Sequence, residues 1–179
     1  ALDGAEDCLV FNNGAAATFA AVLANVKAGD HIVCVDKPYT WTQKLCNDIL
    51  PRFNVTTTYI DGTSIENFER AILPNTTLIY LESPNSWDYK LQDLKAVAEL
   101  AKAENIITII DNSYCTPLYQ KPIEYGIDLV MQTATKYIGG HSDTLGGVLS
   151  GSKQMIEKIF NSPLMHGCLL GDYELCLPG

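Results

Sequence analysis

Arginine is scarce in this 179-residue chain, and Arg52 and Arg70 are its only two examples. Lysine and arginine together number 12 against 21 aspartates and glutamates, which gives a formal net charge of −9. Nucleic acids and anionic membrane surfaces select clustered basic side chains, so we expect neither as a partner. The chain also lacks any apolar run near the ~20 residues that a membrane-spanning helix needs.

Several motifs with a known chemistry are missing as well. No strand is followed by G-x-G-x-x-G and no P-loop lysine motif occurs, which disfavours a nicotinamide- or nucleotide-binding domain. The cysteines form neither a C-x-x-C pair nor a zinc-binding pattern with the three histidines, so we expect no metal site. We interpret most thiols as small core residues of a reduced, cytosolic protein. The cysteines and histidines are Cys8, Cys34, Cys46, Cys115, Cys168, Cys176, His31, His141 and His166.

What the sequence does contain is a regular alternation of short apolar runs and helical segments. Hydrophobic residues make up 47% of the chain, which is typical of a globular protein. The absence of repeats, linkers and low-complexity segments predicts a single domain over residues 1–179. Strands separated by helices form parallel sheets covered on both faces, so we predict a three-layer αβα fold with a mostly parallel sheet. Strands are expected at residues 8–11, 31–36, 55–60, 77–81, 106–110 and 127–131, and helices at 15–24, 43–49, 65–72 and 92–104. A capping box over Thr63–Glu66 is expected to start the helix at 65–72.

Polar groups follow two of these strands. Asp111 ends the most apolar run, and Lys136 lies 25 residues later, one strand-to-strand crossover along the chain. Thr133 and Thr135 precede the lysine and would lie on the same side of an extended backbone, where both hydroxyls could serve one anion. Without further context, the aspartate could simply cap its own loop and the lysine could be a solvated surface group.

Two other strand ends carry candidate groups. Gly14 and Ala15 join the first strand to an alanine-rich helix, a turn whose free N–H groups suit an anion, although plain helix starts of this kind are common. Tyr39 follows the second strand, and as one of nine tyrosines it could equally be a half-buried packing residue.

The run Thr133-Ala134-Thr135-Lys136-Tyr137-Ile138-Gly139-Gly140-His141-Ser142-Asp143 resembles the cofactor-lysine signature of the pyridoxal-phosphate-dependent enzymes of cysteine and methionine metabolism. Asp111-Asn112-Ser113-Tyr114 resembles the Asp-Asn-Thr-aromatic segment of the same family, which comprises cystathionine synthases and lyases, methionine γ-lyase and homoserine sulfhydrylases. The resemblance covers about Cys8 to Phe160. It implies the large domain of the aminotransferase-like fold type I.

The resemblance also implies roles for the candidate residues. Lys136 is expected to condense with the aldehyde of pyridoxal 5'-phosphate and then to move protons between substrate carbons. Asp111 is expected to hold the proton on the ring nitrogen, because a close carboxylate favours the charged form. Gly14, Ala15, Thr133 and Thr135 are expected to bind the phosphate, and Tyr39 to stack on the ring and assist proton transfer.

Two segments resemble one branch of the family more than the others. Ser86, in Glu82-Ser83-Pro84-Asn85-Ser86, stands where γ-acting members commonly carry asparagine, and Ala15 stands in place of a more usual methionine. Both look closer to bacterial cystathionine β-lyases, with γ-synthase, γ-lyase, methionine γ-lyase or O-acetylhomoserine sulfhydrylase as alternatives. Glu82 and Ser86 are the expected substrate residues.

The chain itself resembles the cofactor-binding core of a larger enzyme. Ala1 to Ala5 look like neither a signal peptide nor a translation start, and no arginine is placed to grip a substrate carboxylate. Family members also carry a C-terminal domain and assemble as a dimer of dimers, so we expect a homotetramer for the full-length protein. The bare chain is expected to turn over weakly or not at all, and a non-catalytic module that kept the fold stays an alternative.

Overall fold

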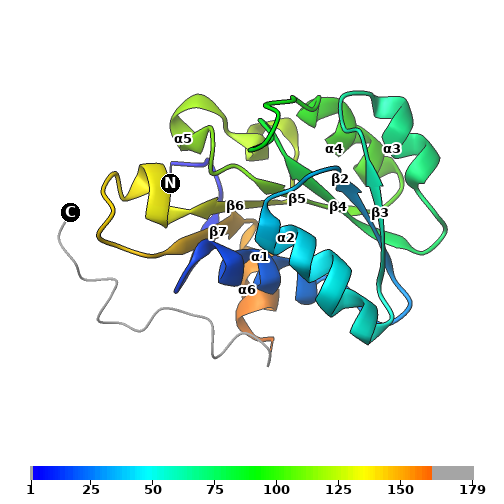
Figure 1. The fold of residues 1–179 in the computed structure, drawn as a ribbon, viewed down its shortest axis with the longest axis horizontal. Coiled ribbons are helices and arrows are strands. Elements are labelled where there is room, and N and C mark those ends of the chain that lie inside the picture. The colour runs from blue at the N-terminus through cyan, green and yellow to red at the C-terminus, as the bar shows by residue number, and fades with distance from the viewer. Residues whose placement is uncertain (1, 163–179) are drawn as a thin grey trace.

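The computed structural model describes residues 2–162, which form one seven-stranded sheet with helices on both faces (Figure 1). The strand order across the sheet is β1-β7-β6-β5-β4-β2-β3. All pairings are parallel except those that β7 makes with β6 and with β1. This arrangement confirms the expected α/β fold with a mostly parallel sheet. The strands are β1 (Asp7–Phe11), β2 (His31–Val35), β3 (Thr56–Ile60), β4 (Thr76–Glu82), β5 (Ile107–Asp111), β6 (Leu129–Thr133) and β7 (Gly147–Gly151).

The helices fall into two layers, because each central strand sends alternate apolar side chains to opposite faces. On β2, Ile32 and Cys34 join one apolar cluster, whereas Val33 and Val35 join the other. The first layer holds α1 (Gly14–Leu23), α2 (Thr40–Lys44), the π-helical turn η1 (Leu45–Ile49), the 3₁₀ turn η2 (Leu50–Phe53) and α6 (Lys153–Phe160). The second holds α3 (Ile65–Ala71), α4 (Leu94–Ala103) and the 3₁₀ turn η3 (Pro122–Tyr125), and the short α5 (Thr116–Tyr119) follows β5.

The carboxyl ends of β1, β2, β4, β5 and β6 meet at one edge of the sheet, and β7 starts there because it runs the opposite way. The chain also changes direction within the sheet: β3 lies on one side of β2 and β4 on the other. Crevices outside the carboxyl ends of strands at such a reversal are the usual ligand sites of open α/β sheets. The fold therefore places the loops after five strands around one region.

Some expected elements differ in the structure. The helix expected at 43–49 begins at Thr40 and continues as the turns η1 and η2. The Thr63–Glu66 capping box is wrong: Ser64 occupies the N-cap position, and the Thr63 hydroxyl donates to Asp61 instead. The strand β7, the helix α6 and the turn η4 (Ala134–Ile138) were not foreseen. No helix within residues 2–162 is long and apolar enough to cross a membrane.

Candidate active site

A cavity of about 770 Å³ opens at the carboxyl edge of the sheet, within the size range of small-molecule sites. A second cavity of about 320 Å³ adjoins it, and Tyr39, Asp111 and Lys136 line both. All the cofactor residues expected from the sequence, Gly14, Ala15, Tyr39, Asp111, Thr133, Thr135 and Lys136, border the larger cavity. The expected substrate residues Glu82 and Ser86 border the smaller one.

The turn before α1 presents free backbone donors to the larger cavity. Asn13 caps the helix: its side chain accepts the N–H of Ala16 at 2.8 Å and its carbonyl accepts that of Ala17 at 3.2 Å. The first N–H groups of a helix have no intrahelical partner, and within residues 2–162 those of Gly14 and Ala15 are not taken by any other group. These donors and the positive end of the helix dipole make this turn suitable for an anion.

The two threonine hydroxyls converge, but not along an extended strand as expected. Thr133 ends β6, whereas Thr135 lies in the π-helical turn η4. Both hydroxyls donate to the carbonyl of Gly146, at 3.4 and 3.3 Å. Bonds of this length are weak, and a hydroxyl proton rotates freely, so both groups can turn to donate to a bound anion.

Asp111 ends β5 and is buried, with 8% of its surface exposed. Burial raises the pKa of its carboxyl group, while hydrogen bonds from Ser113 and the charge of Lys136 act in the opposite direction. The N–H of Ser113 donates to the carboxylate at 2.9 Å, and its hydroxyl accepts the N–H of Thr133 at 2.7 Å. Ser113 thus connects the ends of β5 and β6, and the carboxylate faces the cavities with acceptor capacity left.

Lys136 lies in η4 at a kink, where its backbone angles (φ −96°, ψ −111°) depart from helical values. The kink follows β6 directly and brings the side chain back to the cavities, where its Nζ lies 4.9 Å from the centre of the Tyr39 ring. A cation at this distance from an aromatic face is attracted by the ring. Lys136 is exposed at the cavity, next to Tyr39, which is itself partly exposed.

Some residues of the site gave no signal in the sequence. Trp41 and Lys44 line the larger cavity from α2, with the lysine Nζ 4.8 Å from the indole ring. Ser113 belongs to the Asp111–Tyr114 segment of the resemblance, but the sequence predicted no role for it. The N-cap role of Asn13 follows an ordinary capping rule and could have been predicted.

The cysteines correspond only partly to expectation. Cys34 and Cys46 are buried, whereas Cys8 is exposed and Cys115 partly so. Cys168, Cys176 and His166 lie outside the described residues. Within residues 2–162 no group of three potential metal ligands comes together.

We compared the chain with models of known protein families. The model of the family described as "Cys/Met metabolism PLP-dependent enzyme" matches residues 1–175. The match extends further at both ends than the Cys8–Phe160 stretch on which the sequence resemblance was recognised.

Similar proteins carry more than one activity in their names. A cystathionine gamma-lyase of Bacillus subtilis is 38% identical over 97% of this chain and 46% of its own length. A cystathionine beta-lyase of Staphylococcus haemolyticus is also 38% identical, over 89% of this chain and 41% of its own. The crystal structure of cystathionine gamma-lyase from Lactobacillus plantarum complexed with L-serine matches with a TM-score of 0.85 and 36% identity, over 88% of this chain and 42% of that one. The chain thus spans less than half the length of these relatives.

Proposed function

Because this chain belongs to the Cys/Met metabolism PLP-dependent enzyme family, we propose that it is the cofactor-binding part of a carbon–sulfur lyase acting on cystathionine. Pyridoxal phosphate is the cofactor of this family. When bound, it supplies an electron sink for a carbanion next to the amino-acid nitrogen. The observation that carries the proposal is that a buried carboxylate and an exposed lysine amine, 25 residues apart, border the same cavity.

The residues of the larger cavity fit the cofactor in charge and donor type. Neutral donors at one side, Gly14, Ala15, Thr133 and Thr135, suit a phosphate group. Asp111 is the buried anion that suits a protonated ring nitrogen, since one close opposite charge shifts such a pKa by roughly 1–3 units. Position 14 has no room for a side chain, because a Cβ there would lie 2.8 Å from the Cβ of Thr133.

The reactive roles fall to Lys136 and Tyr39. The amine of Lys136 would hold the cofactor aldehyde and, once displaced by the substrate amine, carry protons between substrate carbons. The ring of Tyr39, which already lies over this amine, would cover the cofactor ring and keep its hydroxyl close to the same protons. Replacement of Lys136 by alanine should abolish the reaction.

We place the substrate side chain in the smaller cavity, bordered by Glu82 and Ser86. The hydroxyl oxygen of Ser86 is buried in the wall of this cavity, close to the carboxylate of Glu82. Serine here, where γ-acting members commonly have asparagine, favours β-elimination of cystathionine to homocysteine, pyruvate and ammonia. The alternative is γ-chemistry, and the equal identity to a β-lyase and a γ-lyase is compatible with both.

The first experiment adds pyridoxal phosphate to the purified protein and to its Lys136→Ala variant. We expect a yellow adduct that borohydride bleaches and fixes covalently at Lys136, and no adduct in the variant. A colourless wild-type protein, or an adduct on another lysine, would overturn the proposal.

The second experiment concerns the reaction and uses the full-length protein. Cystathionine, methionine and O-acetylhomoserine are supplied separately, and pyruvate and 2-oxobutyrate are measured as products. Pyruvate from cystathionine supports β-chemistry, whereas 2-oxobutyrate indicates γ-chemistry. We also propose that the full-length protein is a cytoplasmic homotetramer. Sedimentation tests its oligomeric state, and cell fractionation tests its location.

A further inference from the structure

Glu82, at the end of β4, is an unusual buried charge. It is 3% exposed, and its two carboxylate oxygens accept backbone N–H groups from two different loops. One oxygen accepts the N–H of Tyr39 at 2.7 Å, and the other accepts the N–H of Ser86, also at 2.7 Å. Tyr39 lies in the loop between β2 and α2, and Ser86 lies in the loop between β4 and α4. One carboxylate therefore joins the loops that follow two neighbouring strands.

This carboxylate is costly to bury. No cation is among its hydrogen-bond partners within residues 2–162, and its neighbour across the sheet is another buried acid, Asp111. Burial, and then the charge of Asp111, raise the pKa of Glu82, whereas the bonds from Ser86 and Tyr39 lower it. A buried charge without a cationic partner normally destabilises a fold, so its presence calls for a role beyond packing.

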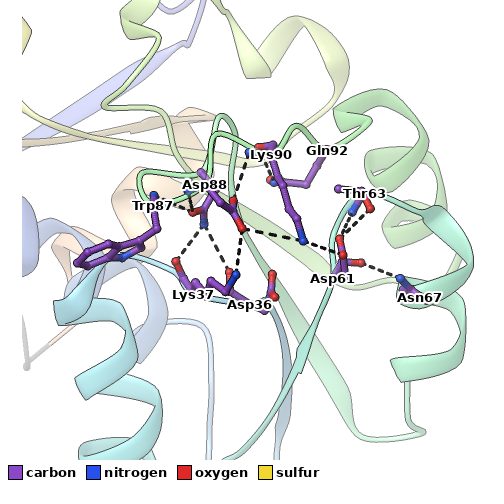
Figure 2. Close-up of polar contacts among 10 residues, drawn as sticks. Asp36, Lys37, Asp61, Thr63, Asn67, Trp87, Asp88, Lys90 and Gln92 are labelled. Atoms are coloured by element: carbon purple, nitrogen blue, oxygen red, sulfur yellow. Dashed lines mark hydrogen bonds and ion pairs between the residues drawn. The ribbon is translucent and has the colours of Figure 1, made fainter.

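Other contacts join the same two loops further from the cavities. The buried side chain of Asn85 donates to the carbonyl of Lys37 at 3.0 Å and more weakly to that of Asp36 at 3.4 Å. Figure 2 shows Lys37 beside Asp88, with which it forms an ion pair of 3.3 Å. That pair is exposed and contributes little. These contacts hold the loops side by side but do not reach the backbone of Tyr39.

The position of the Tyr39 ring depends on the contacts that hold the backbone of Tyr39. Its backbone is non-helical (φ −49°, ψ 144°), and it occupies the N-cap position of α2 without a side-chain capping bond. Tyr39 is 37% exposed, so packing alone restrains its side chain weakly. The bond to Glu82 is the contact that ties its N–H to the sheet, and the ring then lies 4.9 Å from the Nζ of Lys136.

We propose that Glu82 is a positioning residue, whose two carboxylate oxygens fix Tyr39 over Lys136 and hold Ser86 on the wall of the smaller cavity. Glu82 thus acts on the substrate side through the two loops, because both of its oxygens already accept backbone N–H groups. The benefit to the reaction rests on the proposed function, because it assumes that Tyr39 covers the cofactor ring. The geometry also explains why a carboxylate is needed: glutamine offers only one acceptor oxygen, and its NH₂ group would face the second N–H.

The test compares Glu82→Gln with Asp30→Asn, a matched control. Asp30 is also a buried carboxylate, 7% exposed, and accepts the N–H of Lys27 at 2.9 Å and the hydroxyl of Thr77 at 3.2 Å. It precedes β2, at the opposite edge of the sheet from Tyr39. Both bonds go to one oxygen of Asp30, which asparagine can still supply, whereas the two bonds of Glu82 need both oxygens. Removal of a buried negative charge should therefore affect both variants, and a positioning defect only the first.

The first measurement is amide hydrogen exchange without cofactor, resolved by NMR. We expect the amides of Tyr39 and Ser86 to exchange about tenfold or more faster in Glu82→Gln, because a bond to a charged acceptor has been lost or weakened. The same amides should be unchanged in Asp30→Asn. Unchanged exchange in Glu82→Gln, or equal acceleration in both variants, would overturn the inference.

The second measurement is the affinity for pyridoxal phosphate and the circular dichroism of the bound chromophore. Glu82→Gln should bind about tenfold more weakly, with a reduced chromophore signal, while Asp30→Asn binds as the wild type does. Faster exchange with an unaltered affinity and signal would refute the positioning role. If wild-type protein forms no adduct at Lys136, the proposed function fails, and the exchange of Tyr39 and Ser86 still decides whether the carboxylate holds the loops.

Discussion

Replacement of Gly14 by alanine tests the phosphate turn most directly. Gly14 is buried at the start of α1, and an added Cβ would lie 2.8 Å from the Cβ and 3.0 Å from the Oγ1 of Thr133. Real carbon atoms do not approach this closely, so the turn or the threonine must move. Thr133 resists displacement, because its N–H donates to the Ser113 hydroxyl at 2.7 Å.

Two opposing effects set the magnitude. Alanine in place of glycine favours a helix by at most ~1 kcal/mol, and less in the first turn. Overpacking a tight site costs ~1–3 kcal/mol, so the clash wins and the free energy of unfolding should fall by ~1–2 kcal/mol. For a chain of this size that corresponds to a decrease in Tm of about 2–8 °C. The movement also misaligns the backbone N–H groups of the turn and the hydroxyl of Thr133, so cofactor affinity should fall by about tenfold or more.

The assay titrates pyridoxal phosphate into the folded variant by absorbance, with thermal unfolding followed by circular dichroism. Gly151→Ala, at the far end of β7, serves as the control, since its Cβ would meet the carbonyl of Asp128 and the Cδ2 of Leu129 at 2.8 Å, a comparable clash outside both cavities. That change should leave the affinity within a fewfold of wild type. Wild-type affinity in a folded Gly14→Ala variant would show that this turn does not bind the phosphate.

Substitutions at three further positions give distinct outcomes. Asp111→Asn should lower cofactor-dependent activity of the full-length protein by roughly 10- to 1,000-fold. The Tm at pH 7 should stay equal or rise, because the change removes a buried carboxylate with a raised pKa, and a lower Tm would contradict this account. Tyr39→Phe should keep cofactor affinity and lose turnover, whereas Tyr39→Ala should lose both; equal affinities of the two variants would exclude stacking. Burial raises the pKa of Asp3 in the folded state, so its contribution to stability is complete at low pH and is lost as pH rises through that pKa. Asp3→Asn should therefore raise the free energy of unfolding at pH 7 by about 0.5–1.5 kcal/mol. The gain should vanish below about pH 4, and denaturant titrations at both pH values measure it.

The sequence by itself determined the layers and the composition of the cavity. Alternating apolar strands and helices predict a covered parallel sheet, and polar residues directly after β5 and β6 must then meet at one edge. Asp111 and Lys136 could be placed together for this reason, because the position of each group at or after an apolar strand is a local property of the chain.

Only the tertiary structure decided how these groups are held. The hydroxyls of Thr133 and Thr135 meet at the carbonyl of Gly146. Gly146 directly precedes the antiparallel strand β7, which no local sequence pattern predicted. The carboxylate of Glu82 binds Tyr39, 43 residues away along the chain, through a backbone N–H that carries no sequence signal. Bonds to backbone groups of distant loops depend on how the strands are ordered and on where each loop turns, and these follow from packing over the whole domain.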